Sequence, residues 1–181
     1  NQLWHVDLRT YEHKEKGRTY ESLTPAPKAG RMVFDPAAVR PIPNTLRGSD
    51  PAASPDGERL VYLEYGDGTM NVVTIKLDGS EKKRLTSFHD GTWFQRPDWS
   101  PDGRSIIVSM FRNYQNVLMI LDAQTGEMTP ITWDSHESFD AHWAADGRIY
   151  FSSDPGGIFN VFAYDPKTKE ILQLTNVIGG A

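Results

Sequence analysis

Three carboxylates recur at a regular spacing and are the first candidates for chemistry. Asp56, Asp102 and Asp146 each precede a glycine, and successive members are 46 and 44 residues apart. Together they look like a carboxylate set of the kind that acid–base catalysis uses. Each one, however, stands in a tight-turn sequence, in which Asp bonds the local backbone and Gly accepts a positive φ. We therefore predict a structural role for all three.

The other side chains carry no enzyme signature. The sequence has no Gly-x-Ser-x-Gly nucleophile elbow, no phosphate-binding glycine-rich loop and no cysteine. His136-Glu137 lacks the second histidine four residues after His136 that a zinc-protease helix requires, because Asp140 stands there. We predict that this segment is not an enzyme and holds no metal or cofactor. A catalytic domain elsewhere in a parent chain is left open.

Composition indicates a soluble globular chain. The 181 residues are 38% hydrophobic and 24% charged, with a formal net charge of −5. An acidic chain without a long basic run argues against binding to nucleic acid. No apolar run approaches the roughly 20 residues that a membrane-spanning helix needs, so we predict no membrane insertion.

The turn that would hold these aspartates belongs to a longer repeat. Ser54-Pro55-Asp56-Gly57 and Ser100-Pro101-Asp102-Gly103 are each followed by an apolar run, and Ala144-Ala145-Asp146-Gly147 keeps only the Asp-Gly. Two further landmarks share the period of 43 to 46 residues: an asparagine, and an apolar residue followed by threonine. They are Asn71, Asn116 and Asn160, and Leu85-Thr86, Ile131-Thr132 and Leu174-Thr175. A period of this size with internal turns is typical of propeller blades.

We predict an all-β fold, a β-propeller of four-stranded antiparallel blades, present as half a blade plus three blades. The predicted blades span residues 50–86, 87–132 and 133–175, with inner strands at 50–53, 97–100 and 141–144. Residues 1–24 would form the outer strands of a preceding blade, closed by Leu23-Thr24 and carrying a protruding hairpin near 11–19. Residues 25–49 would form a long inter-blade loop, and residues 176–181 would begin another blade.

The order Ser-Pro-Asp-Gly, Asn, Asp and Leu-Thr resembles the TolB-like propeller repeat family. The resemblance covers residues 50–175, with a weaker match at 1–24, and Trp99 and Trp143 match the aromatic of the inner strand. Family members include periplasmic TolB, which binds envelope proteins, and gating propellers attached to serine oligopeptidases. The resemblance implies a periplasmic or secreted location. It is evidence for a fold rather than for one activity.

Blade geometry predicts which side chains meet at one face. The loops that enter the inner strands and those that follow the second strands lie at the same end of a propeller, and here they are rich in aromatic and ionisable residues. Aromatics and arginine are favoured at protein interfaces. The candidate binding residues are Trp93, Phe94, Arg96, Arg112, Tyr114, Trp133, His136, Asp140 and His142. Packing of Trp93 and Trp133 between blades is the alternative. Arg96 and Asp98 are expected to pair with Asp140 and His142 across blades.

Two classes of function follow. In the first, the chain is a non-catalytic scaffold, part of a larger bacterial envelope protein, that binds a protein or peptide partner and the remaining blades of its own propeller. In the second, it is the accessory propeller of a serine oligopeptidase-like hydrolase. A small-molecule or glycan binder that uses rim tryptophans is a third hypothesis.

Overall fold

The computed structural model describes residues 2–6, 13–15, 18–20, 39–132 and 136–179. It contains three four-stranded antiparallel sheets, each built from strands that follow one another in the sequence. We call them blade 1, blade 2 and blade 3. Blade 1 comprises β5 (Gly48–Ala53), β6 (Arg59–Gly66), β7 (Thr69–Lys76) and β8 (Lys83–Arg84). Blade 2 comprises β9 (Trp93–Trp99), β10 (Ser105–Arg112), β11 (Gln115–Asp122) and β12 (Met128–Pro130). Blade 3 comprises β13 (Ser138–Trp143), β14 (Ile149–Ser153), β15 (Asn160–Asp165) and β16 (Glu170–Gln173).

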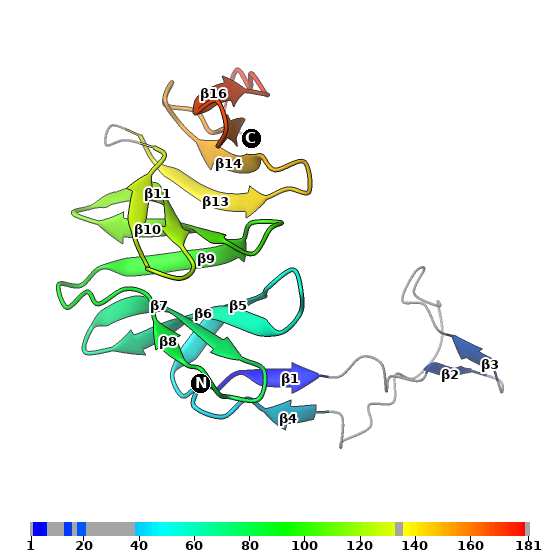
Figure 1. Cartoon of the computed structure of the whole chain (residues 1–181). Coiled ribbons are helices and arrows are strands. Elements are labelled where there is room, and N and C mark those ends of the chain that lie inside the picture. Colours follow the sequence, from blue (N-terminus) through cyan, green and yellow to red (C-terminus); the bar gives the residue numbers. More distant parts are fainter. Residues whose placement is uncertain (1, 7–12, 16–17, 21–38, 133–135, 180–181) are drawn as a thin grey trace.

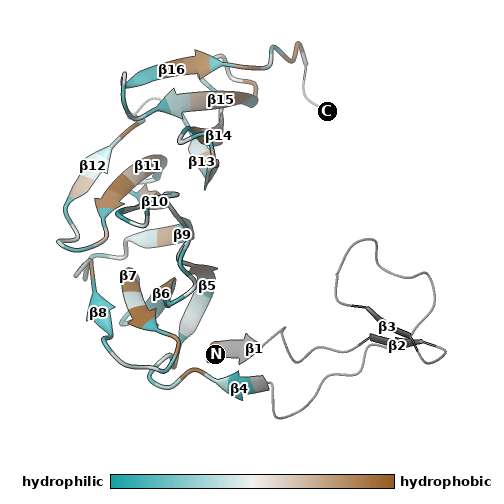
Figure 2. Cartoon of the chain, turned by 45° about the vertical axis from the view of Figure 1, so that its right-hand side comes forward, coloured by the Kyte–Doolittle hydropathy of each residue, from teal (hydrophilic) through white to brown (hydrophobic). Residues whose placement is uncertain are grey.

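The blades are stacked face to face along an arc (Figure 1). Their first strands, β5, β9 and β13, lie on the concave side, and β8 and β12 lie on the outside (Figure 2). This is the all-β, incomplete propeller that the repeat predicts. The part of the chain that the structure describes holds no helix capable of crossing a membrane.

The Ser-Pro-Asp-Gly turn works as its residue types predict. The Ser100 hydroxyl donates to the Asp102 carboxylate at 2.6 Å and accepts from the Ser105 backbone N–H at 2.9 Å. The same Asp102 oxygen accepts the backbone N–H of Arg104 at 3.0 Å. These bonds, led by that from Ser100, lower the pKa of Asp102. Asp102 is therefore occupied within its own turn.

Blade 3 departs from this sequence because its turn is one residue shorter. The backbone N–H of Ser100 bonds the carbonyl five residues on, at Ser105, whereas that of Ala144 bonds the carbonyl four residues on, at Arg148. In blade 2 the Ser100 hydroxyl accepts the Ser105 N–H, and the shorter turn of blade 3 has no residue in the place of Ser105. The Asp146 carboxylate still accepts the Arg148 N–H at 3.0 Å. A serine at position 144 would therefore lack one of the two hydrogen bonds that the Ser100 hydroxyl makes.

The repeated asparagine bonds the segment that follows the blade in blades 1 and 3, whereas in blade 2 the Asn116 amide group donates to the Glu137 carboxylate at 2.6 Å. Asn71 is 4% exposed, and its side-chain oxygen accepts the Thr86 hydroxyl at 2.9 Å and the Phe88 N–H at 2.8 Å. Its amide group donates to the Phe88 carbonyl at 3.1 Å. Asn160 repeats the arrangement with Thr175. The buried Asn71 amide therefore has a hydrogen-bonding role.

The inner strands begin earlier than predicted because each contains a bulge. The register of β5, β9 and β13 against its neighbour shifts once, next to a non-glycine residue with positive φ. These residues are Asp50 (φ 47°), Arg96 (φ 47°) and Asp140 (φ 56°). A bulge interrupts the alternation of side chains. The pattern therefore indicated only the half of each strand that follows the bulge.

Hydrophobic cores lie between neighbouring sheets. Between blades 1 and 2, Val61, Leu63 and Val72 pack against the blade 2 residues Phe94 and Ile106, all fully buried. Between blades 2 and 3, the core joins Ile107, Leu118 and Ile131 to Ile149 and Phe151. Burial of these side chains from both sides supplies the main stabilisation of a stacked sheet.

The preceding half-blade closes later than predicted. β1 (Trp4–Val6) pairs with β4 (Val39–Pro41), so part of the predicted inter-blade loop is a strand. Ile42 and Thr45 make the bonds of a closing pair: the Ile42 N–H donates to the Leu3 carbonyl, and the Leu3 N–H donates to the Thr45 hydroxyl at 3.1 Å. Leu23-Thr24, to which we assigned this role, lies outside the described residues. The predicted hairpin is present as β2 (His13–Glu15) and β3 (Arg18–Tyr20).

Blade 3 presents an uncovered face. Val161 and Leu174 are 40% and 51% exposed, whereas their counterparts in blade 1, Val72 and Leu85, are 0% and 8% exposed beneath blade 2. In the described structure no sheet lies against this face of blade 3. The same sequence positions that form a core in blades 1 and 2 are therefore open to solvent here.

Candidate binding face

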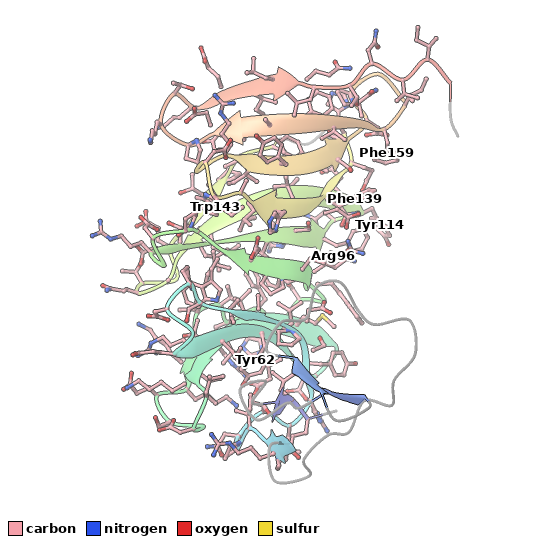
Figure 3. The ribbon with its side chains drawn as sticks, turned by 90° about the vertical axis from the view of Figure 1, so that its right-hand side faces the viewer. Tyr62, Arg96, Tyr114, Phe139, Trp143 and Phe159 are labelled. Carbon is pink, nitrogen blue, oxygen red and sulfur yellow. The ribbon has the colours of Figure 1, made fainter. Side chains whose placement is uncertain are left out.

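The two ends of the blades differ in chemistry. We call rim the end that carries the hairpins between second and third strands together with the entries to the inner strands. The opposite end carries the Asp-Gly turns and is called the turn face. Figure 3 shows Tyr114, Phe139 and Phe159 at the rim and Trp143 toward the turn face. Among the residues whose side chains the structure describes, the tyrosine, tryptophan and phenylalanine side chains that are at least 40% exposed all lie at the rim: Tyr65, Trp93, Tyr114 and Phe159.

Two aromatic pairs are part of the rim. Trp93 is 40% exposed at the start of β9 and contacts Tyr65, with ring centroids 5.9 Å apart. On blade 3, Phe139 and Phe159 lie 5.0 Å apart. Tyr65, Phe139 and Phe159 were not among the residues predicted from the sequence. In the sequence each of these three residues is an aromatic next to a predicted hairpin, and such a residue is hard to distinguish from a core residue at the end of a strand.

Arg112 is held in place at the rim by two neighbours. Its guanidinium bonds the Asp90 carboxylate at 2.7 Å and lies 5.4 Å from the centre of the Phe88 ring. Hydrogen bonds from Thr92, and then the hydrogen bond from Arg112, lower the pKa of Asp90. Half of the Arg112 side chain, 47%, stays exposed. A guanidinium fixed in this way still has N–H groups directed to solvent.

The predicted pairs across blades are present on the inner strands. Arg96 on β9 bonds Asp140 on β13 at 2.8 Å, and His142 Nδ1 lies 2.7 Å from Asp98 Oδ2. The same Asp98 oxygen accepts the backbone N–H of Trp143 at 2.9 Å. Charged side chains from neighbouring blades therefore meet on the concave side, and Asp98 ties blade 2 to blade 3.

The remaining predicted residues are placed differently. Phe94 is fully buried against Phe88, so it belongs to the core between blades and has no surface to offer a partner. His136 is exposed at the rim, and the neighbouring Glu137 accepts the Asn116 amide at 2.6 Å. Trp133 lies outside the described residues. Within the described ranges, no three histidine or acidic side chains come together as a metal site would require.

Sheets of four antiparallel strands, stacked about an arc with their first strands inside, define a β-propeller. The chain belongs to the family described as TolB beta propeller domain, whose model matches residues 47–178. The match begins at β5 and extends beyond the last strand of blade 3.

Relatives with known names fall into two groups. The Tol-Pal system protein TolB of Francisella tularensis subsp. mediasiatica is 26% identical over 121 residues, which are 66% of this chain and 27% of that protein. An uncharacterized peptidase of Bacillus subtilis, YuxL, is 35% identical over 65 residues, 35% of this chain and 10% of that protein. The chain thus spans about a quarter of the length of the first of these relatives.

Solved structures give the same two groups. A putative TolB from Agrobacterium tumefaciens superposes with a TM-score of 0.68 at 16% identity, covering 99% of this chain and 64% of that one. A puromycin hydrolase superposes with a TM-score of 0.63 at 23% identity, covering 79% of this chain and 24% of that one. At these identities the likeness concerns the fold.

Proposed function

We propose that this chain is a non-catalytic propeller segment that binds a protein or peptide through its rim. The observation that carries the proposal is the gathering of exposed aromatic side chains at the rim, while the described turn face has none as exposed. Tyrosine, tryptophan and arginine are the residues that dominate binding energy at interfaces. The TolB relatives, named as members of the Tol-Pal system, support a place in a bacterial envelope assembly and a periplasmic location.

Capture from an envelope extract tests this proposal with matched variants. Immobilised chain carrying Trp93→Ala should lose its captured partner, because this change removes a large, partly exposed ring from the rim. Lys167→Ala with Lys169→Ala alters the turn between β15 and β16, at the opposite end, and should leave capture unchanged. Equal capture by both variants and the unaltered chain would place the binding surface elsewhere.

A second candidate is the accessory propeller of a serine hydrolase. It is favoured by the superposition on a puromycin hydrolase and by the match to a peptidase of Bacillus subtilis. In this case the rim partner is a catalytic domain. Labelling of the natural polypeptide with a fluorophosphonate, which reacts with activated serines, separates the two candidates. Labelling supports the hydrolase, and its absence from a folded natural polypeptide supports the scaffold.

A further inference from the structure

A cleft separates blades 1 and 2 at the turn face, at the opposite end of the sheets from the rim. Its volume is about 810 Å³, which lies within the range of about 300–1,000 Å³ that is typical of small-molecule sites. Blade 1 lines the cleft with its Asp-Gly turn and the start of β8. Blade 2 lines it with its own Asp-Gly turn and the loop from β11 to β12. The cleft is therefore separate from the aromatic rim.

A threonine at the floor of the cleft leaves room that an isoleucine fills in the next blade. Thr74 on β7 pairs with Val61 on β6. Ile120 on β11 pairs with Ile107, which follows its Asp-Gly turn at the same distance as Val61, so the two pairs are equivalent. Ile120 packs against the core between blades 2 and 3, whereas Thr74 lines the cleft beside Trp99. The repeat thus has a smaller, polar side chain where the cleft lies.

The Thr74 hydroxyl is buried without a partner. The residue is 3% exposed, and within the described ranges its hydroxyl makes no hydrogen bond. Thr74 alternates with Val72 along β7, so both side chains face blade 2, and that of Thr74 faces the cleft. Polar groups at this depth are normally bonded, because an unpartnered one is unfavourable. A polar ligand that reaches the floor would supply the missing hydrogen bond.

A lysine at the mouth of the cleft can bind an anion. The Lys83 ammonium donates to the Gln124 carbonyl across the two blades, and it forms no ion pair in the part of the chain that the structure describes. An ammonium has three N–H donors, so two of them stay available to a ligand. The other cations of the lining are in ion pairs: Arg59 with Glu81, and Lys82 with Glu64. Lys83 is therefore the cation that an anionic group would contact.

The walls of the cleft carry further hydrogen-bonding groups. Asp56, Gln124 and Thr125 are exposed and line it. Carboxylate, amide and hydroxyl groups together can accept from and donate to the hydroxyl groups of a ligand. An apolar ligand would leave these groups and the Thr74 hydroxyl without partners. The lining therefore favours an anion that also carries several hydroxyl groups.

We propose that the cleft between blades 1 and 2 binds a small hydroxylated anion, an acidic sugar or a sugar phosphate, through Lys83 at its mouth and Thr74 at its floor. The Lys83 ammonium donates to the charged group of the ligand, which is among the stronger polar contacts. The Thr74 hydroxyl bonds a hydroxyl group of the ligand. This site lies outside the rim, so the inference goes beyond the proposed function.

Isothermal titration calorimetry with defined probes tests the inference. The probes are glucuronate and glucose-6-phosphate, and the controls are glucose, which has no charge, and inorganic phosphate, which has no sugar. We expect at least one anionic sugar to bind at least tenfold more tightly than either control, and the tighter of the two identifies the charged group. Inorganic phosphate that binds as tightly as both sugars indicates an adventitious ion only. That result, equal affinity for glucose, or no measurable binding of either anionic sugar would overturn the inference.

Matched variants locate the bound sugar. Thr74→Ile should weaken its binding at least tenfold, because the larger side chain fills the floor as Ile120 does in blade 2. The thermal midpoint of this variant should not fall, since it buries apolar surface in place of an unpartnered hydroxyl. Thr74→Val keeps the size of threonine and removes only the hydroxyl, so it should weaken binding by a smaller factor.

The cation is tested in the same way. Lys83→Ala should weaken binding of the anionic sugar at least tenfold, because a hydrogen bond to a charged group is lost. Lys167→Ala removes an exposed cation from the turn between β15 and β16 and should leave binding unchanged. Affinity that survives both Lys83→Ala and Thr74→Val would overturn the inference. Capture that depends on Trp93 should be the same in all these variants, because none of them changes the rim.

Discussion

Replacement of Ser100 by alanine measures how much the recurrent turn contributes to stability. The hydroxyl, in a residue 2% exposed, makes a bond to the Asp102 carboxylate and accepts the Ser105 N–H. A net hydrogen bond contributes about 1 kcal/mol, and a bond to a charged group contributes more. Because Asp102 is exposed, the bond from Ser100 to its carboxylate should contribute no more than an ordinary hydrogen bond. We therefore expect Ser100→Ala to lower the free energy of unfolding by about 2 kcal/mol. For a chain of this size that lowers the thermal midpoint by about 4–8 °C.

The matched control is Ala144→Ser in blade 3. Its shorter turn has no N–H for the added hydroxyl to accept, so we expect no gain beyond about 0.5 kcal/mol. Thermal and urea unfolding followed by circular dichroism give both values. A neutral Ser100→Ala, or an Ala144→Ser that stabilises by as much as Ser100→Ala destabilises, would refute this explanation of the two turns.

Three further results are expected. Asp98→Ala should lower the free energy of unfolding, measured in urea, by about 2 kcal/mol, because it leaves the Trp143 N–H without its carboxylate partner. His142→Ala should lower it by under about 1 kcal/mol, because the His142 side chain is 73% exposed. Equal losses in the two variants would contradict this explanation. Gly126→Ala should destabilise by about 3 kcal/mol, because residue 126 has a positive φ and the added Cβ would overlap the Leu85 carbonyl. Gly57→Ala should cost only about 1 kcal/mol, because residue 57 also has a positive φ but has open space around it. A lower thermal midpoint for Gly57→Ala than for Gly126→Ala would refute the close approach of Gly126 to Leu85. Hydrogen bonds from Ser100 and from the backbone hold the pKa of Asp102 below its usual value, so the ionised carboxylate stabilises the fold. This stabilisation is complete above about pH 4 and is lost as the pH falls through the lower pKa of the folded state. Urea midpoints measured from pH 7 to pH 2 should show this loss, and the loss should be smaller in Ser100→Ala.

The sequence was sufficient for the sheets that repeat fully. Turn residues, the repeated asparagine and the apolar-threonine pair all share one period, so several independent signals agreed on each strand of blades 1 to 3. The first half-blade offered no such agreement. Leu23-Thr24 matched the closing pair by residue type, whereas Ile42 and Thr45, which make its hydrogen bonds, are separated by two residues and do not form the expected dipeptide. Only the hydrogen bonds to Leu3 identify them.

The rim was harder to predict than the blades. The sequence predicted that Trp93, Arg112 and Tyr114 lie at the same end of the sheets, and all three are exposed there. Phe94, one residue after Trp93, points into the core because β9 begins before its bulge. Side-chain direction alternates along a strand, so a sequence reading that misplaces the start of the strand assigns the wrong residue of a neighbouring pair to the surface.

The hydrogen bonds of Asn71 also determine where blade 1 can be separated from blade 2. Asn71 belongs to the third strand of blade 1, yet two of its three hydrogen bonds go to Phe88, beyond the last strand of that blade. A segment cut at Thr86 would keep all four strands but leave a buried amide short of partners. The transferable unit of this chain is therefore longer than its sheet. A blade grafted into another propeller should retain its outgoing linker as far as the residue equivalent to Phe88.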